Sequence, residues 1–204
     1  MTEREKMVSG QLYNPTDAEL MALRKKVRQA CIEFNRSNED ETQRRYELLH
    51  SVLKSHKKDF YFEPNIRFDY GCNTSVGENF FANYDCTILD VAPVTIGDNV
   101  MFGPNVTIAT PVHPLVADER AIQQFPDGVY DLEYAKPITI CDGVWLASGV
   151  IVNGGVTIGK NSVIGSGSVV TRDIPEGVVA VGNPCKVLRK ITDADRMFDR
   201  KKTV

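Results

Sequence analysis

His113 is the residue whose type and position most clearly indicate chemistry in this sequence. The chain holds three histidines, of which His50 and His56 fall in or beside a predicted helix, whereas His113 falls in a long repetitive region. An imidazole titrates near neutral pH, so it can take a proton from a hydroxyl group and give it back. His113 is therefore a candidate general base, although its position alone leaves a structural role open.

Other reactive groups are poorly represented. The five cysteines are widely spaced without a C-x-x-C pair, which favours small, buried, reduced side chains over a disulfide framework or a zinc knuckle (Cys31, Cys72, Cys86, Cys141 and Cys185). No serine stands in a nucleophile elbow. Neither a covalent intermediate nor a metal site is predicted.

The region around His113 is built on a six-residue repeat. Aliphatic side chains stand at every sixth position, and a small or aliphatic residue follows each after four more positions. The two series are Val170, Ile164, Ile158, Val152, Leu146 and Ile140, and Ile174, Ser168, Ser162, Val156, Val150 and Val144. Upstream, the register recurs at Ile96, Phe102 and Ile108, at Val100, Val106 and Val112, and in an earlier block at Val76, Ala82 and Ile88.

A period of six fits neither a helix nor a heptad, but it fits one flat face of a three-sided coil. Stacked coils would bury a column of aliphatic side chains, and each coil would bond only to its neighbours. The narrow interior is expected to leave little room for aromatic side chains, in keeping with an aromatic content of 8%.

His113 lies where this register breaks. Ile108 and Ile140 are separated by 32 residues, which is not a multiple of six, so the segment between them is expected to leave the coil as an extended loop. Loops mounted on rigid scaffolds commonly carry catalytic groups.

The first part of the chain follows a different pattern. All of the 15 glycines except Gly10 lie between Gly71 and Gly182, and the residues before them show a helical stripe (Leu20, Leu23, Val27, Ala30 and Phe34). Thr16 and Glu19 predict a capping box at the start of that helix. A second helix is predicted over residues 41–55, with Leu48, Leu49, Val52 and Leu53 on its buried side. We therefore expect a helical cap at 1–59, a β-helix at 60–190 and a tail at 191–204.

Composition excludes several functional classes. The chain has 204 residues and a formal net charge of −3, so no global positive field would hold it on nucleic acid or an anionic membrane. Its polar start and the lack of a long apolar run predict a cytoplasmic protein without membrane association.

Several motifs together resemble a known family. The runs Ile96–Val100, 156–161 and 163–171 resemble the hexapeptide repeats of left-handed parallel β-helix acyltransferases. The motifs at Phe81–Asn83, Thr110–Pro114, Gly143–Trp145 and Gly182–Pro184 are similar to those of the maltose and galactoside O-acetyltransferases. The resemblance extends from about residue 3 to residue 191 and implies a mainly β fold.

The resemblance implies an acetyl-CoA-dependent O-acetyltransferase, with acetyl-CoA as co-substrate and no metal. His113 would deprotonate a hydroxyl that attacks the acetyl thioester directly, while Asn83 stabilises the oxyanion. A positioned amide donor at an oxyanion is worth roughly 3 to 4 kcal/mol.

The resemblance implies a sugar as the acceptor, and carboxylates suit such a polyol because they can accept hydrogen bonds from several hydroxyls. By resemblance, its site would draw on Asp17, Asp69, Asn83 and Glu133. Asp69 and Glu133 depart from the galactoside group, which has Ser and Met there, and are closer to the maltose group, while Val91 replaces a second acidic residue. The segment from His113 to Pro137, with Phe125, Tyr130 and Tyr134, is also longer than the usual family loop, which leaves the sugar unnamed.

The resemblance further assigns a coenzyme site and an assembly. Residues expected to line the groove for the pantetheine arm and phosphates are Trp145, Ala147, Ser148, Ser166, Thr171, Arg172, Lys186 and Arg189. The family forms trimers, so a homotrimer with His113 and Trp145 serving one site from different subunits is expected.

Other functional classes fit the sequence less well. A xenobiotic or other small-molecule O- or N-acetyltransferase of the same fold is the main alternative, and a non-catalytic β-helix module is a more distant one. A zinc enzyme of the carbonic anhydrase type would need three imidazole ligands, whereas the repeat region supplies His113 alone.

Overall fold

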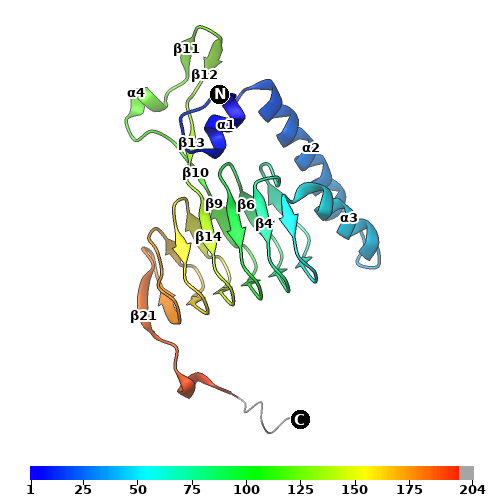
Figure 1. Ribbon diagram of the computed structural model, residues 1–204, viewed down its shortest axis with the longest axis vertical. Helices are drawn as coiled ribbons and strands as arrows, with labels where there is room; N and C mark the ends of the chain where they lie inside the picture. The colour runs from blue at the N-terminus through cyan, green and yellow to red at the C-terminus, as the bar shows by residue number, and fades with distance from the viewer. Residues whose placement is uncertain (198–204) are drawn as a thin grey trace.

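A computed structural model describes residues 1–197 and shows three helices followed by a stack of β-coils (Figure 1). The helices are α1 (Glu3–Val8), α2 (Ala18–Asn35) and α3 (Thr42–Val52). They lie at one end and along one side of the stack, and an extended loop projects from the middle of the stack. The predicted fold class is confirmed.

Each coil contributes one short strand to each of three sheets, here called the first, second and third faces. The first face holds β1 (Ser55–His56), β4 (Thr74–Val76), β7 (Val94–Ile96), β14 (Ile138–Ile140) and β17 (Thr157–Ile158). The second holds β2 (Tyr61–Phe62), β5 (Phe81–Ala82), β8 (Met101–Phe102), β15 (Trp145–Leu146), β18 (Val163–Ile164), β20 (Val178–Val181) and β21 (Lys186–Lys190). The third holds β3 (Arg67–Phe68), β6 (Thr87–Leu89), β9 (Thr107–Ala109), β16 (Ile151–Asn153) and β19 (Val169–Val170).

The coils stack in parallel register, and the six-residue pattern fills their interior. Phe102 pairs with Leu146 and Leu146 with Ile164, so equivalent positions of successive coils lie above one another. Both predicted series between residues 140 and 174 are buried. The pairing of β20 with β21 is antiparallel, which ends the parallel stack at this side.

The predicted register is wrong at Val112. Val112 leaves the coil and is half-buried in the loop, because the coil already ends at Thr110. The Thr110 hydroxyl donates to Leu89 O (2.8 Å) and accepts from Ala92 N (2.9 Å).

The expectation of little room for aromatic side chains is wrong in the first coils. The Phe80 ring meets those of Phe62 and Phe102 edge to face, with ring centroids 5.1 and 5.0 Å apart. Side chains of α2 and α3, among them Phe34 and Leu49, pack in the same core as these rings.

The cap is fixed to the first coils by polar bonds. The Asn35 side chain exchanges two hydrogen bonds with the backbone of Ile66 (2.9 and 3.0 Å), and the buried guanidinium of Arg45 donates to Phe62 O at 3.1 Å. Parallel pairing begins at Ser55, so α3 ends at Val52 rather than at residue 55, and the coil starts ahead of the expected boundary at residue 60.

Asp17, not Thr16, caps α2. Its Oδ1 accepts hydrogen bonds from Glu19 N (3.0 Å) and Leu20 N (3.2 Å), whereas the Thr16 hydroxyl turns to Asn14 Oδ1. The predicted capping box is therefore wrong, because α2 starts one residue later and the Asp17 carboxylate accepts from its first unsatisfied N–H groups.

The loop between β9 and β14 has its own structure. Its base is an antiparallel ribbon of β10 (Pro111–Val112) and β13 (Tyr134–Ala135), and its tip holds α4 (Ala117–Arg120) and the hairpin β11 (Gln123–Phe125) and β12 (Gly128–Tyr130). After β21 follows a 3₁₀ helix, Asp193–Asp195. Residues 198–204 of the expected tail lie outside the described part of the chain.

Replacing Ile158 with Ala should test the inward column. Its side chain is fully buried, so the cavity should lower the free energy of unfolding by about 2 to 5 kcal/mol, whereas Ile122→Ala, in the loop and 72% exposed, should change it by less than about 1 kcal/mol. Denaturant titrations of both variants measure the difference, and equal losses would contradict the assigned register.

Candidate active site

His113 stands directly after β10, between two carboxylates. Its Nε2 lies 3.8 Å from Glu133 Oε1 and its Nδ1 lies 3.8 Å from Asp131 Oδ2, while 45% of the imidazole side chain remains exposed. Because β10 pairs with β13, His113 continues opposite Glu133 on the ribbon. The imidazole is thus accessible, with an acidic group beside each of its nitrogens.

Glu133 is held from behind by the N-terminal segment. The Tyr13 phenol donates to Glu133 Oε2, and the backbones of the two residues pair, with N–H to O distances of 3.0 and 3.4 Å. Burial raises the pKa of the Glu133 carboxyl, against the opposing effects of the Tyr13 hydrogen bond and the His113 charge. Burial and the neighbouring Glu133 charge raise the pKa of Tyr13, so its hydroxyl stays a donor.

Asp69 adds a second half-buried carboxyl to this group. It follows β3, and its Oδ1 lies 3.8 Å from an Arg28 nitrogen on α2. Burial raises the pKa of Asp69, while the charges of Arg28 and Arg24 lower it. The Asp69 charge also raises the pKa of Glu133, which places these two predicted acceptor residues in one electrostatic neighbourhood with His113.

The turn after Asp69 is organised by the buried carboxylate of Asp90. Asp90 Oδ1 accepts from Tyr70 N (2.9 Å) and Gly71 N (3.0 Å), and Oδ2 accepts from Asn73 N (3.2 Å) and the Thr74 hydroxyl (3.0 Å). Burial raises the pKa of Asp90 to about 6, although these four hydrogen bonds favour the charged form. This carboxylate therefore fixes the backbone that carries Asp69.

Asn83 lies on a different edge of the coil. It directly follows β5, at the corner between the second and third faces. The loop that carries His113 starts after β9, at the corner between the third and first faces. The Asn83 side-chain oxygen accepts from Tyr84 N at 2.8 Å, which leaves its NH₂ group as the donor. Within one chain, the two predicted catalytic residues are on separate edges.

The edge of Asn83 also carries four of the predicted coenzyme residues. Ala147, Ser148 and Ser166 occupy the same corner in later coils, and Trp145 is 46% exposed on the adjoining strand. Gly103 follows β8, in the coil between those of Asn83 and Ser148. A Cβ atom at Gly103 would stand 2.7 Å from Ser148 N, so the coils can stack closely here only with a glycine.

The remaining predicted residues are dispersed. Asp17 caps α2, as described above, and Thr171 and Arg172 follow β19, at the corner between the third and first faces. Lys186 and Arg189 lie on exposed β21, where the Arg189 guanidinium is engaged by both oxygens of Asp195 (2.8 and 2.9 Å).

A groove of about 710 Å³ lies on the opposite side of the ribbon from His113. Side chains alternate along a strand, so Asp131 and Glu133 point to the imidazole, while Leu132 and Tyr134 line the groove. Phe125 and Leu12 complete much of its apolar wall. The groove is therefore separated from the base by the ribbon itself.

Tyr13, Asp131 and the turn at Asp90 were not among the residues predicted for the site. The run Tyr130-Asp131-Leu132-Glu133-Tyr134 alternates acidic and apolar residues, which is the period of a strand with one acidic face, and could have identified Asp131. Tyr13 and Asp90 gave no comparable signal, because their partners are distant in sequence.

Within residues 1–197, no cluster of three or more histidine, cysteine, aspartate or glutamate side chains is arranged to hold a metal ion. All five cysteines are free. None of the helices in this part of the chain is long and apolar enough to cross a membrane.

Comparison with known proteins agrees with this architecture. Residues 6–57 match the family model described as the maltose acetyltransferase hexapeptide capping motif, and residues 137–172 match that of the bacterial transferase hexapeptide (six repeats). The galactoside O-acetyltransferase of Escherichia coli (strain K12) is 41% identical over 198 residues, covering 97% of this chain and 93% of that protein. The chain belongs to the maltose and galactoside O-acetyltransferase family.

Solved structures of this family have the same fold. A maltose O-acetyltransferase from Clostridium difficile 630 matches with a TM-score of 0.88 at 49% identity, covering 95% of this chain and 99% of that one. A galactoside acetyltransferase in complex with coenzyme A matches with a TM-score of 0.88 at 40% identity, covering 98% and 97%. The predicted family and enzyme class, an acetyl-CoA-dependent acyltransferase, are confirmed.

The raised pKa of Asp90 makes a testable contribution to stability. A carboxyl with a pKa of about 6 when folded binds its proton more tightly than in the unfolded chain, so its contribution to stability is complete below about pH 4 and is lost as the pH rises through 6. The free energy of unfolding of wild type minus that of Asp90→Asn should therefore grow by roughly 2 kcal/mol as the pH falls from about 6 to about 4. Urea titrations across this range measure it.

Asp98→Asn is the matched control for that measurement. The Lys57 side chain and the backbone of Glu78 hold the pKa of Asp98 below its usual value, so its contribution is lost as the pH falls below the window rather than within it. Parallel curves for wild type and Asp90→Asn between pH 4 and 6 would contradict the assigned state of Asp90.

Proposed function

We propose that this protein transfers the acetyl group of acetyl-CoA to a hydroxyl of a sugar, with His113 as the general base. The observation that carries the proposal is the half-exposed imidazole beside Glu133 and close to Asp69, at the foot of a loop on a rigid coil. Family relatives whose names include galactoside and maltose O-acetyltransferases support the sugar as acceptor class.

The proposed reaction is a direct attack without a covalent enzyme intermediate. His113 takes the proton of the acceptor hydroxyl as its oxygen attacks the thioester carbonyl carbon, which gives a tetrahedral centre with a negatively charged oxygen. The NH₂ group of Asn83 donates to that oxygen. When the C–S bond breaks, the imidazolium returns its proton to the leaving coenzyme A thiolate, and the neutral base is restored.

The acceptor hydroxyls would be recognised by carboxylates around the base. Glu133 supplies an acceptor oxygen next to His113, and Asp69 lies near enough for its charge to act on Glu133. Asp17, at the start of α2, has one oxygen that is not used by the helix cap bonds. The hairpin β11–β12 lengthens the loop above this site, which keeps a different small-molecule alcohol or amine as the second candidate acceptor.

The coenzyme would bind along the edge that carries Asn83. The exposed Trp145 ring and the backbones of Ala147, Ser148 and Ser166 suit the pantetheine arm, and the cations of Arg172, Lys186 and Arg189, with Thr171, suit its phosphates. For Arg189 this requires that the phosphate competes with Asp195 for the guanidinium.

A complete site would need two copies of the chain. Within one chain, His113 and Asn83 lie on separate edges of the stack of coils. A neighbouring subunit would therefore bring its Asn83 and Trp145 to this chain's His113. We propose a homotrimer with three such shared sites in the cytoplasm.

Replacing His113 with Ala should lower acetyl transfer by about two orders of magnitude or more, because the base would be lost. Thiol release from acetyl-CoA measures the rate, and the melting temperature should stay near the wild-type value. His50→Ala, an exposed histidine of the cap, is the control and should keep full activity. Full activity in His113→Ala would contradict the general-base role.

Mixing two inactive variants should test whether sites are shared. If His113→Ala and Asn83→Ala chains are unfolded together and refolded as mixed oligomers, some interfaces combine an intact His113 with an intact Asn83, and activity should return to roughly a quarter of wild type by random pairing. Each variant refolded alone should stay inactive. Mixed samples as inactive as the parents would exclude a site composed of both chains.

The acceptor is best identified by a panel assay of thiol release with maltose, glucose, galactosides, amino sugars and chloramphenicol-like alcohols. Stimulation by sugars alone supports the proposal. Release with only the non-sugar alcohols or amines would favour the second candidate, and release with none of them would contradict the sugar assignment, while direct binding of coenzyme A would still test the donor site.

A further inference from the structure

We propose that Tyr13 is a positioning residue for the catalytic base: by engaging one oxygen of Glu133, its phenol directs the other oxygen to His113. This inference rests on the proposed function of His113. It assigns a role in the reaction to the N-terminal segment, which lies outside the coil and does not touch the reacting atoms.

The contacts of Glu133 divide between its two oxygens. Oε2 accepts the hydrogen bond of the Tyr13 phenol, and Oε1 lies 3.8 Å from His113 Nε2. The backbones of Tyr13 and Glu133 also pair, which fixes the distance between the two side chains. A carboxylate held at one oxygen and at its own backbone has little freedom to rotate, so Oε1 stays directed to the imidazole.

Tyr13 is itself held rigidly. Its ring is 1% exposed and packs in a small core between the cap and the coil with Met7, Leu20, Tyr70, Val91, Ala92 and Ala135. Val91, itself 2% exposed, offers an apolar contact surface in this core. The phenol is therefore the polar end of a buried side chain whose position is set by packing.

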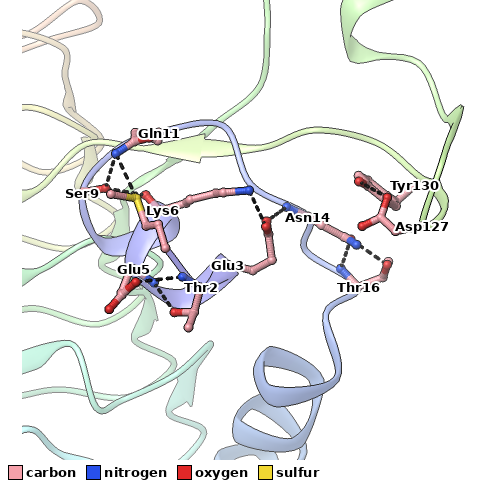
Figure 2. A network of polar contacts seen from close by, with 11 residues as sticks. Thr2, Glu3, Glu5, Lys6, Ser9, Gln11, Asn14, Thr16, Asp127 and Tyr130 are labelled. Atoms are coloured by element: carbon pink, nitrogen blue, oxygen red, sulfur yellow. Dashed lines mark hydrogen bonds and ion pairs between the residues drawn. The ribbon is translucent and has the colours of Figure 1, made fainter.

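The N-terminal segment is in turn tied down by a polar network, shown in Figure 2. Glu3 Oε2 accepts from the backbone N–H of Asn14, next to Tyr13, at 2.6 Å, and its Oε1 accepts from Lys6 at 2.5 Å. The Asn14 side chain accepts from both the backbone and the hydroxyl of Thr16. These bonds fix the backbone on the C-terminal side of Tyr13, where a free terminal segment would otherwise fray.

The phenol hydrogen bond also favours the charged form of Glu133. Burial raises the pKa of this carboxyl, and the Tyr13 bond opposes that increase. The titratable and charged groups that face Glu133 and Tyr13 from the surrounding elements are His113 and Asp131 on the ribbon, Asp69 and Tyr70 after β3, and Arg24 on α2. Only the Tyr13 bond can be removed by deleting a single oxygen atom while leaving all of these groups in place.

The test is Tyr13→Phe, with Tyr130→Phe as matched control. Tyr130 is also a mostly buried tyrosine that donates to a carboxylate, Asp127 (2.9 Å), but it lies in the loop hairpin and does not touch Glu133. We expect Tyr13→Phe to raise the pKa of Glu133 by about one unit. ¹³C NMR titration of the glutamate carboxyls measures this pKa, and the Glu133→Gln variant assigns the resonance. Tyr130→Phe should leave this titration unchanged.

In kinetics, Tyr13→Phe should lower kcat about tenfold, part of the about 10² to 10⁴ that a general base contributes, without changing the KM for acetyl-CoA. Because Glu133 would stay protonated up to a higher pH, the acid limb of the pH profile should move to higher pH by about one unit. Tyr130→Phe should keep the wild-type kcat and profile.

The outcomes separate this proposal from the proposed function. A lower melting temperature with an unchanged Glu133 titration and kcat would mean that Tyr13 is merely structural and would overturn the proposal. If no acceptor supports turnover, the proposed function fails, yet the NMR titration still decides whether Tyr13 controls Glu133. A raised Glu133 pKa with unchanged kcat would overturn the positioning role.

Discussion

The inward column of aliphatic side chains is the constraint on which the rest of this protein depends. Equivalent positions of successive coils pair in register, for example Phe102 with Leu146 and Leu146 with Ile164, so that each buried side chain rests on the one in the next coil. Inserting or deleting one residue within a strand of a coil would turn its buried side chains outward. The column therefore fixes every corner of the coil, including those that carry Asn83 and Ser148.

A departure from this register creates the site. The coil ends at Thr110 and resumes at Ile138. The intervening chain leaves as a ribbon in which β10 pairs with β13, and His113 directly follows β10. A two-stranded ribbon is marginal by itself, and here Tyr13 and the small core around it supply the missing support. His113 thus stands on an irregular element that is stabilised on one side by the regular coil and on the other by the helical cap.

The electrostatics of this region come from burying carboxyls near one another. Burial raises the pKa of Asp69, Asp90 and Glu133, and each is compensated by a different kind of partner: an arginine, backbone N–H groups, or a phenol. Asp90 uses its bonds to hold a turn, whereas Glu133 keeps one oxygen beside the imidazole. Similar residues therefore serve as scaffold in one case and as part of the proposed site in the other.

The sequence by itself determined the coil, the loop and the family, because a six-residue period and its interruption are local patterns that repeat along the chain. Its motifs also predict His113 and Asn83 as catalytic residues, and those roles stay a prediction. Only the tertiary structure placed those two residues on separate edges, made Asp17 the helix cap, filled the first coils with aromatic rings and joined Tyr13 to Glu133. These features depend on contacts between residues far apart in sequence, such as positions 13 and 133, which no periodicity records.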